Sequence, residues 1–299
     1  MDKLRFGTAG LPFKRPAPKY PDGVAILRQL GPKGSGGLGH MEMEFVHGVV
    51  RKTKDDTPES YRGKLEAYMT RHRETGRIAR EHDITLSAHG PYYINLNAKE
   101  YQKVEDSKRR VVETAMVGHA AGAFSITFHP AFYLGMDPKI VYTIVKKRLE
   151  TIVETIRQEG VKLRISPETT GKGSQFGSID ELIGLAEETE GVGICIDFAH
   201  LHARSGGKLN TYDEFREVLT KVEDHLGREA LRTMHIHLAG IAYSEKGERN
   251  HLILRKSDMN YPDLLRSFKD FDIAGAVVCE SPNLQGDALL LKRTFDSIS

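Results

Sequence analysis

The chain has 299 residues, of which 39% are hydrophobic and 28% charged, and its net charge is +2, an ordinary composition for a soluble globular protein. No apolar stretch approaches the roughly 20 residues of a membrane span, and the net charge is far from the strongly basic profile of an obvious nucleic-acid binder, so it does not decide for or against one. The opening residues lack the pattern of a secretion signal, so we expect a cytoplasmic protein with no membrane partner.

Strand-like and helix-like segments alternate along the chain. The expected strands are residues 4–6, 43–46, 84–89, 124–129, 162–168, 192–197, 232–237 and 275–280. The expected helices are residues 23–30, 60–81, 107–121, 138–158, 179–188, 212–226, 261–269 and 288–295. Apolar strands separated by helices pair in parallel, and eight of them close into a barrel. We therefore predict one α/β domain over residues 1–299, a (β/α)8 TIM barrel, with an open doubly wound sheet as the alternative.

Six of the expected strands stop on a side chain that can bind a metal ion. These residues are His89, His129, Glu168, Asp197, His237 and Glu280. Because the carboxyl ends of parallel strands meet on one rim of a barrel, we expect them around a single pocket. Imidazole with carboxylate suits zinc. Clustered cations lower the pKa of a bound water to about 7 and so supply hydroxide at neutral pH.

Other conspicuous residues are interpreted as structural. His235 alternates with His237 along one strand, which predicts a deeper, hydrogen-bonded position inside the barrel. Cys195 and Cys279 lie within apolar strands and are expected in the core. The glycine-rich segment 31–40 has neither a dinucleotide-binding nor a phosphate-loop spacing. It is therefore interpreted as a flexible connection, with His40 as a loop histidine.

The metal-capable residues lie in motifs that resemble those of the endonuclease IV family. The motifs are His89-Gly-Pro-Tyr-Tyr-Ile-Asn-Leu, Phe-His129-Pro, Glu168-Thr-Thr-Gly-Lys-Gly-Ser, Asp197-x-x-His200, His237-Leu and Glu280-Ser-Pro. The resemblance runs nearly from end to end. It implies an α/β-barrel apurinic/apyrimidinic endonuclease with a trinuclear zinc cluster, which cuts the phosphodiester bond 5′ to an abasic site.

The resemblance also implies which residues hold each ion. One zinc takes His89 and His129, and Glu168 bridges it to a second. The second ion is completed by Asp197, His237 and Glu280, and the third takes His200 and His251. Catalysis is thus expected to depend above all on Glu168. The expected cofactor is Zn²⁺, two or three ions, with Mn²⁺ or another divalent ion as the alternative.

The chain departs from the family pattern at the third ion. The family has Asp-x-His before its last ligand, whereas this sequence has Glu248, Arg249, Asn250 and His251, with Arg249 at the Asp position. Three possibilities stay open. Glu248 replaces the missing ligand, the site is weaker, or it fills only when DNA is bound.

The family resemblance indicates Tyr92 and Tyr93 as DNA-binding residues. Wedging an aromatic ring between bases costs a few kcal/mol, and less where a base is missing, which favours an abasic site. The expected partner is double-stranded DNA containing abasic sites, bound by a monomer. The alternative is that both tyrosines only pack their loop.

Two other functions are kept as alternatives. The first is a metal-dependent sugar isomerase or epimerase on the same barrel, because fold alone does not fix chemistry. Such an enzyme is expected to use one or two ions and fewer histidines than the five proposed here. The second is a DNA-binding homologue with weakened catalysis, which the altered Asp position allows.

Overall fold

Eight parallel strands form the central sheet, in the order β6, β4, β3, β2, β1, β12, β9, β8. The structure is a computed structural model that describes residues 2–12 and 19–298. In chain order the strands are β1 (Leu4–Ala9), β2 (His40–Glu44), β3 (Thr85–His89), β4 (Ser125–Phe128), β6 (Arg164–Pro167), β8 (Cys195–Asp197), β9 (Met234–Leu238) and β12 (Gly275–Cys279).

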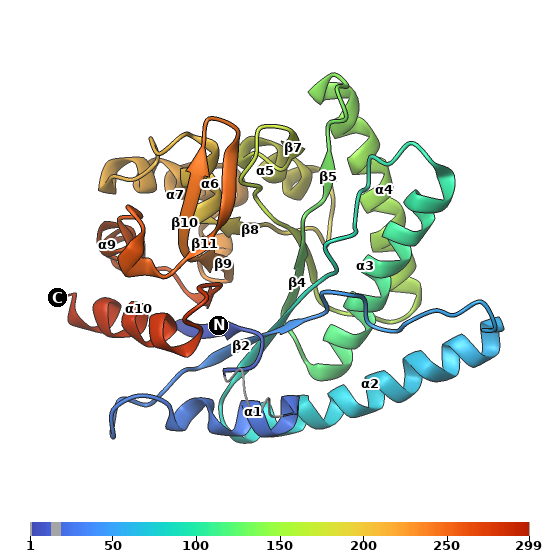
Figure 1. Cartoon of the computed structure of the whole chain (residues 1–299), viewed down its shortest axis with the longest axis horizontal. Coiled ribbons are helices and arrows are strands. Elements are labelled where there is room, and N and C mark those ends of the chain that lie inside the picture. Colours follow the sequence, from blue (N-terminus) through green and yellow to red (C-terminus); the bar gives the residue numbers. More distant parts are fainter. Residues whose placement is uncertain (1, 13–18, 299) are drawn as a thin grey trace.

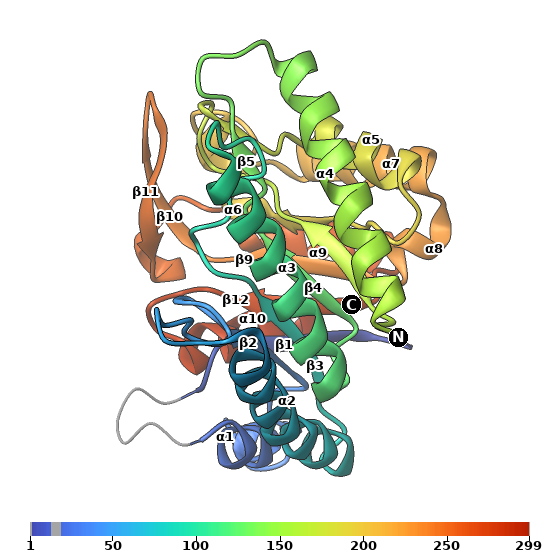
Figure 2. The same cartoon turned by 90° about the vertical axis from the view of Figure 1, so that its right-hand side faces the viewer.

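Contacts between β6 and β8 close this sheet into a barrel. Parallel bridges join Ile165 to Val192 and Glu168 to Cys195. The backbone N–H of Thr169 donates to the Cys195 carbonyl at 3.0 Å. The prediction of a (β/α)8 TIM barrel is confirmed, and the open sheet is excluded. Figures 1 and 2 show the strands in the centre with helices around them.

Helices of different lengths cover the outside of the barrel. They are α1 (Tyr20–Ile26), α2 (Pro58–Glu81), α3 (Tyr101–Ala121), α4 (Pro138–Gln158), α5 (Ile179–Glu188), α7 (Tyr212–Leu226), α9 (Tyr261–Asp270) and α10 (Gln285–Ser297). In α4 the buried residues Val141, Val145, Leu149 and Ile152 recur every three or four positions. This spacing forms one apolar face toward the strands. The bounds predicted for α4, α5 and α7 agree with the structure.

Several short elements lie outside the regular alternation, and the sequence analysis predicts none of them except the turn Leu27–Gln29, which falls within the helix expected at residues 23–30. They are α6 (Phe198–Arg204), α8 (Arg228–Leu231), the 3₁₀ turns Leu27–Gln29 and Leu254–Lys256, and the strand pairs β5 (Ala131–Phe132) with β7 (Gln175–Phe176) and β10 (Gly240–Ser244) with β11 (Gly247–Leu252). The β10–β11 hairpin stands at one edge of the molecule in Figure 2 and packs against α6.

Two predictions about the second strand are wrong. The strand expected at residues 43–46 is His40–Glu44, and His40 opens it with a fully buried side chain instead of lying in a loop. The ring nitrogens of His40 lie 2.9 Å from Thr85 Oγ1 and 3.0 Å from Ser87 Oγ. These hydroxyls take the place of water, so a polar residue is accommodated inside the barrel.

The structural interpretations of His235 and the cysteines are confirmed. His235 is buried, and its Nε2 lies 2.7 Å from Glu42 Oε2. Cys195 and Cys279 are free thiols in the core. Among the described residues, no helix combines the length and apolar character needed to cross a bilayer.

Candidate metal centre

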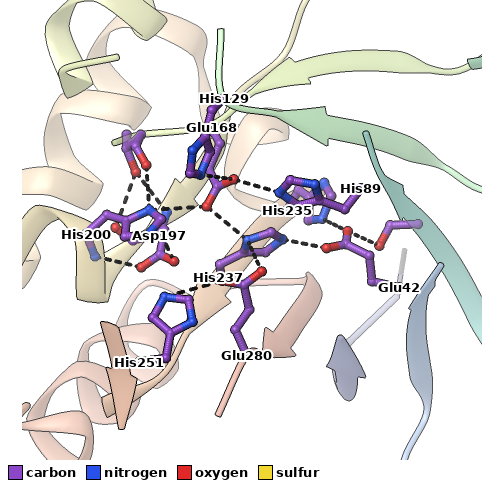
Figure 3. A network of polar contacts seen from close by, with 12 residues as sticks. Glu42, His89, His129, Glu168, Asp197, His200, His235, His237, His251 and Glu280 are labelled. Carbon is purple, nitrogen blue, oxygen red and sulfur yellow. Dashed lines mark hydrogen bonds and ion pairs between the residues drawn. The ribbon is translucent and has the colours of Figure 1, made fainter. Parts of the chain in front are cut away.

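The side chains predicted as metal ligands come together at the carboxyl ends of the strands, as Figure 3 shows. Ion-pair contacts of 3.1 to 3.7 Å join all of them into one network: His89, His129, Glu168, Asp197, His200, His237, His251 and Glu280. Six follow or close barrel strands, whereas His200 lies on α6 and His251 on β11. The unpredicted short elements therefore supply two of the eight.

Glu168 lies at the middle of this network. Its Oε2 is 3.2 Å from Nε2 of both His89 and His129. Its Oε1 is 3.1 Å from His237 Nδ1 and 3.3 Å from His200 Nδ1. Burial raises the pKa of the Glu168 carboxyl, but the charges of His237 and His129 outweigh burial and hold that pKa well below its ordinary range. Glu168 is thus an ionised carboxylate that faces different imidazoles with each oxygen.

Asp197 and Glu280 add two more carboxylates on one side of Glu168. Glu280 Oε1 lies 3.3 Å from His237 Nδ1. Asp197 Oδ1 accepts a hydrogen bond from the His200 backbone N–H at 2.7 Å and so caps α6. The other oxygen of Asp197 is buried and has no hydrogen-bond partner among the described residues. A buried carboxylate oxygen without a hydrogen bond is costly, and a cation would satisfy it.

The β10–β11 hairpin brings His251 and Glu248 to the far side of the cluster. His251 Nε2 lies 3.7 Å from Glu280 Oε2, and Glu248 Oε2 lies 3.5 Å from His200 Nε2. The rings of His200 and His251 are 5.6 Å apart. His251 Nε2 is also a buried atom without a hydrogen-bond partner among the described residues. Arg249, in contrast, is exposed.

A bulge in β11 explains how Glu248 reaches this position. Ala242 pairs with Asn250 and Tyr243 pairs with Glu248, so Arg249 is an extra residue without a partner in the ladder. In a regular strand, residues three apart point to opposite faces. Because the bulge adds one residue, Glu248 and His251 lie on the same face.

Two glycines allow the hairpin to approach the loop after Glu168. A Cβ at Gly171 would lie only 2.6 Å from the Cβ of Glu248, and one at Gly247, where φ is +91°, would lie 2.2 Å from the Gly171 carbonyl oxygen. The Glu248 N–H donates to that same carbonyl at 2.9 Å. A side chain at either glycine would therefore move Glu248 away from His200.

Backbone carbonyls orient two of the imidazoles. The Nδ1 of His89 lies 2.6 Å from the Gly90 carbonyl oxygen, and the Nδ1 of His200 lies 2.9 Å from that of Thr169. A proton on Nδ1 leaves Nε2 free as a ligand, the usual arrangement around protein metal ions. Burial lowers the pKa of His89, but Glu168 and Glu44 outweigh burial and raise it to about 10. The carboxylates thus create a field that favours positive charge.

The donor atoms form groups of the size that a divalent cation needs. Several sets of potential ligand atoms lie within 4.8 Å of one another, and three of these sets match the predicted ions: His89, His129 and Glu168; Glu168, Asp197, His237 and Glu280; and Asp197, His200 and His251. Glu168 belongs to the first two sets. Three or four nitrogen and oxygen donors per set match the coordination of zinc, so the residues present fit a multinuclear metal centre.

Sequence reasoning missed two carboxylates on β2, Glu42 and Glu44. Glu42 is fully buried, and burial raises its pKa, but contacts with His237 and His235 hold that pKa well below its ordinary value. Burial raises the pKa of Glu44 to about 8. The alternation His40, Glu42, Glu44 is the signal that could have found them, because side chains of period two share one face of a strand.

Tyr92 and Tyr93 lie in the loop after β3, with exposed fractions of 54% and 63%. The ring of Tyr92 lies 5.6 Å from that of His89 and 6.3 Å from that of His129. Both tyrosines line a surface cavity of about 420 Å³ together with Arg110. Tyr92 is therefore an exposed aromatic beside the predicted ligands, a position that packing within the loop does not require.

Comparison with known proteins places the chain in a family. Residues 37–297 match the xylose isomerase-like TIM barrel family, and the chain belongs to it. An uncharacterized protein of Methanocaldococcus jannaschii is 43% identical over 99% of this chain and 98% of its own length. A probable endonuclease 4 of Mycoplasma pneumoniae is 25% identical over 69% of this chain and 72% of its own length.

Solved structures with this fold include proteins of different named activities. Endonuclease IV from Thermus thermophilus superposes with a TM-score of 0.66 at 18% identity, covering 98% of both chains. A D-tagatose 3-epimerase-like protein superposes with a TM-score of 0.65 at 14% identity, covering 98% of this chain and 96% of its own. The resemblance to endonuclease IV is thus confirmed at the level of fold and of relatives' names, and the fold alone does not select between these chemistries.

Proposed function

We propose that this protein is a metal-dependent phosphodiesterase of DNA repair that cuts double-stranded DNA 5′ to abasic sites. The observation that carries the proposal is the position of Glu168, whose two oxygens lie 3.1 to 3.3 Å from four histidine nitrogens. A carboxylate surrounded by imidazoles and further carboxylates suits a bridge between two cations. The relative named probable endonuclease 4 supports the same substrate class.

The three donor sets support one ion each. His89 and His129 would hold the first, with Glu168 as the bridge to the second, and Asp197, His237 and Glu280 would complete the second. His200 and His251 would hold the third. The ions would be Zn²⁺, since nitrogen and carboxylate donors suit zinc, with Mn²⁺ as the alternative.

Glu248 would complete the third site in place of the aspartate that the family pattern has at Arg249. The bulge at Arg249 puts Glu248 on the face of β11 that also carries His251. Its Oε2 lies 3.5 Å from His200 Nε2. A longer glutamate displaced by one residue thus offers its oxygen to the same two histidines, and exposed Arg249 offers no donor.

The ligands and the tyrosines would have different roles in the proposed reaction. Divalent cations in such sites lower the pKa of water to about 7 and stabilise negative charge on a phosphate. Glu168, Asp197 and Glu280 hold the cations and offset their charge, while the buried histidines leave little room for bulk water behind them. Tyr92 and Tyr93 would enter the duplex beside the pocket and favour a sugar that lacks its base.

The proposal is tested with a duplex that contains one abasic site. The purified protein should cut it on the 5′ side, and a chelator should abolish cleavage. Glu168→Gln keeps the side chain's shape but replaces one oxygen with an amide nitrogen that does not bind cations. We expect its kcat to fall by more than about 100-fold, since even outer-sphere partners of metals contribute 10- to 100-fold.

Glu113→Gln is the matched control for Glu168→Gln. Glu113 is a buried glutamate on α3 that pairs with Arg109, away from the predicted ligands. This variant should keep full activity. Undiminished cleavage by Glu168→Gln would contradict the bridging role, and stoichiometric metal without cleavage by the natural protein would favour the weakened DNA-binding homologue.

A metal-dependent sugar isomerase or epimerase is the second candidate. The set Glu168, Asp197, His237 and Glu280 could hold a single ion by itself, and the D-tagatose 3-epimerase-like protein has the same fold. This candidate leaves His89, His129, His200 and His251 without a role. Incubation with simple ketoses should give no isomerised product, and turnover of a ketose without cleavage of the abasic duplex would favour the sugar enzyme.

A further inference from the structure

Glu42 lies inside the barrel directly beneath the candidate metal centre, and Figure 3 shows it beside His235 and His237. Its Oε1 is 2.8 Å from His237 Nε2, and its Oε2 is 2.7 Å from His235 Nε2. The Ser87 hydroxyl donates to Oε2 at 2.6 Å. A carboxylate with no exposure to water is costly to bury unless it is paired, so these partners account for its presence.

The contact with Glu42 determines which nitrogen of His237 faces the predicted ligands. Nδ1 lies 3.1 Å from Glu168 Oε1 and 3.3 Å from Glu280 Oε1, whereas Nε2 faces Glu42. The contact between His237 Nε2 and Glu42 Oε1 deviates from ideal hydrogen-bond angles. Neither of these two atoms has a regular hydrogen-bond partner among the described residues. Two lone pairs 2.8 Å apart would repel each other, so Nε2 carries a proton. A second proton, between Nδ1 and Glu168 Oε1, is the one that a bound cation would replace.

The ring orientation of His237 is therefore the reverse of that of the other two oriented imidazoles. In His89 and His200 a backbone carbonyl contacts Nδ1, which leaves Nε2 of His89 toward Glu168 and Nε2 of His200 toward Glu248. In His237 a carboxylate contacts Nε2 and leaves Nδ1 toward them. A histidine in the middle of a strand inside a barrel has no nearby free carbonyl, since neighbouring strands use theirs in the ladder.

We propose that Glu42 is a positioning residue that fixes the ring and the tautomer of His237, so that Nδ1 is presented to the metal centre. The inference rests on the proposed function. Glu42 does not touch the cations or the substrate; it acts through His237, as carboxylates behind ligating histidines do at zinc sites. None of the motifs that resemble endonuclease IV contains it.

Neighbouring side chains hold Glu42 in place. Ser87 donates to it and lies 3.0 Å from His40 Nε2, while His235 also contacts Ser125 Oγ at 3.3 Å. These residues come from β2, β3, β9 and β4, so the layer crosses the barrel beneath the ligands. A buried network of hydrogen bonds such as those of Glu42 Oε2 rigidifies the groups it contains.

The test compares zinc binding by the full-length protein, Glu42→Gln and Ser125→Ala, using competition with a chromophoric chelator. Glu42→Gln keeps the volume but loses the charge, and we expect one zinc dissociation constant to rise by about 10- to 100-fold. Ser125→Ala removes a hydroxyl from the same layer without touching His237, and it should bind zinc as the natural protein does. A general loss of packing would instead affect both variants.

The tautomer of His237 is measured separately in the zinc-loaded natural protein, by ¹⁵N NMR of labelled histidines. We expect the proton on Nε2 for His237, and on Nδ1 for His89 and His200. A proton on Nδ1 of His237, or equal zinc affinity in Glu42→Gln and the natural protein, would overturn the inference. The proposed function stands if the natural protein binds zinc and cleaves abasic DNA, whatever the result for Glu42. If the natural protein binds no divalent metal, both the role of Glu42 and the proposed function are wrong.

Discussion

The proposed role of Tyr92 predicts how much this one exposed side chain contributes to the preference for abasic over intact DNA. Stacking of a base on an aromatic ring contributes about 1–3 kcal/mol. We therefore expect Tyr92→Ala to reduce the preference for an abasic over an intact duplex by roughly 5- to 150-fold, with metal content unchanged. Binding titrations with both duplexes measure this ratio. Tyr92→Phe keeps the ring and should keep the preference, whereas unchanged selectivity in Tyr92→Ala would contradict the wedge.

His40 predicts a dependence of stability on pH. Burial lowers its pKa from 6.5 to about 3, so the folded chain binds fewer protons at His40 than the unfolded chain between these values. The free energy of unfolding should then fall as pH drops below 6.5. His40→Gln can still bond to Thr85 and Ser87 but does not titrate.

Urea unfolding of both proteins in chelator, at several pH values between 4 and 6, measures the contribution of His40. We expect the slope of unfolding free energy against pH to be smaller in His40→Gln by up to about 1.4 kcal/mol per pH unit. Equal slopes would mean that His40 is protonated in the folded chain.

At the scale of the element, the β10–β11 hairpin gives a prediction about the third ion. Elemental analysis should find one ion fewer in Glu248→Ala than in the natural protein. Gly171→Ala should lose the same ion, because the added Cβ would displace Glu248. Deletion of Arg249 removes the extra residue and leaves Glu248 and His251 two positions apart, on one face of a regular strand. That deletion should keep the ion.

Glu245→Ala is the control for these variants, because Glu245 lies at the exposed turn of the hairpin. Its metal content should equal that of the natural protein. An unchanged ion count in Glu248→Ala would show that Glu248 is no ligand.

Elements with a clear periodicity were predictable from the sequence, and those defined by long-range contacts were not. The apolar face of α4 repeats every three or four residues, and its bounds were predicted correctly. β2 was misplaced because His40 and Glu42 are polar, and only partners on β3 and β9 make them strand residues. The hairpin was missed because Gly247–Leu252 is largely polar and has no apolar repeat.

At the scale of the whole molecule, the order of strand-end residues was enough to predict the barrel and the convergence of six of the eight cluster residues, whereas His200 and His251 were expected only from the family resemblance. Parallel strands in a closed sheet must end on one rim, so residues 89 to 280 converge without any local signal. Orientation within the cluster was not predictable, because the contacts of His237 with Glu42 depend on side chains from distant strands. The substrate could not be predicted from the fold either, because the same barrel architecture supports many different reactions.

Metal removal should destabilise the whole barrel, because the candidate ligands come from β3, β8, β9 and the segments after β4, β6 and β12. Ions bound only by the folded state stabilise it by about 4 kcal/mol at 1,000 times their dissociation constant. For a chain of 299 residues that corresponds to roughly 6 °C in Tm, because the entropy of unfolding grows with chain length. Calorimetry with zinc, with chelator and after zinc is restored should show this loss and recovery.

Glu168→Gln makes the thermal experiment specific to the centre. With one carboxylate oxygen of Glu168 replaced, the Tm of the variant should rise far less on addition of zinc than that of the natural protein, while Glu113→Gln on α3 should respond like the natural protein. Without cations, the buried carboxylates of Glu168 and Asp197 depend on the histidines alone, so the chelated barrel should open first at this rim. Equal zinc responses in all three proteins would place the stabilising ions elsewhere, because ions bound outside the cluster would not depend on Glu168.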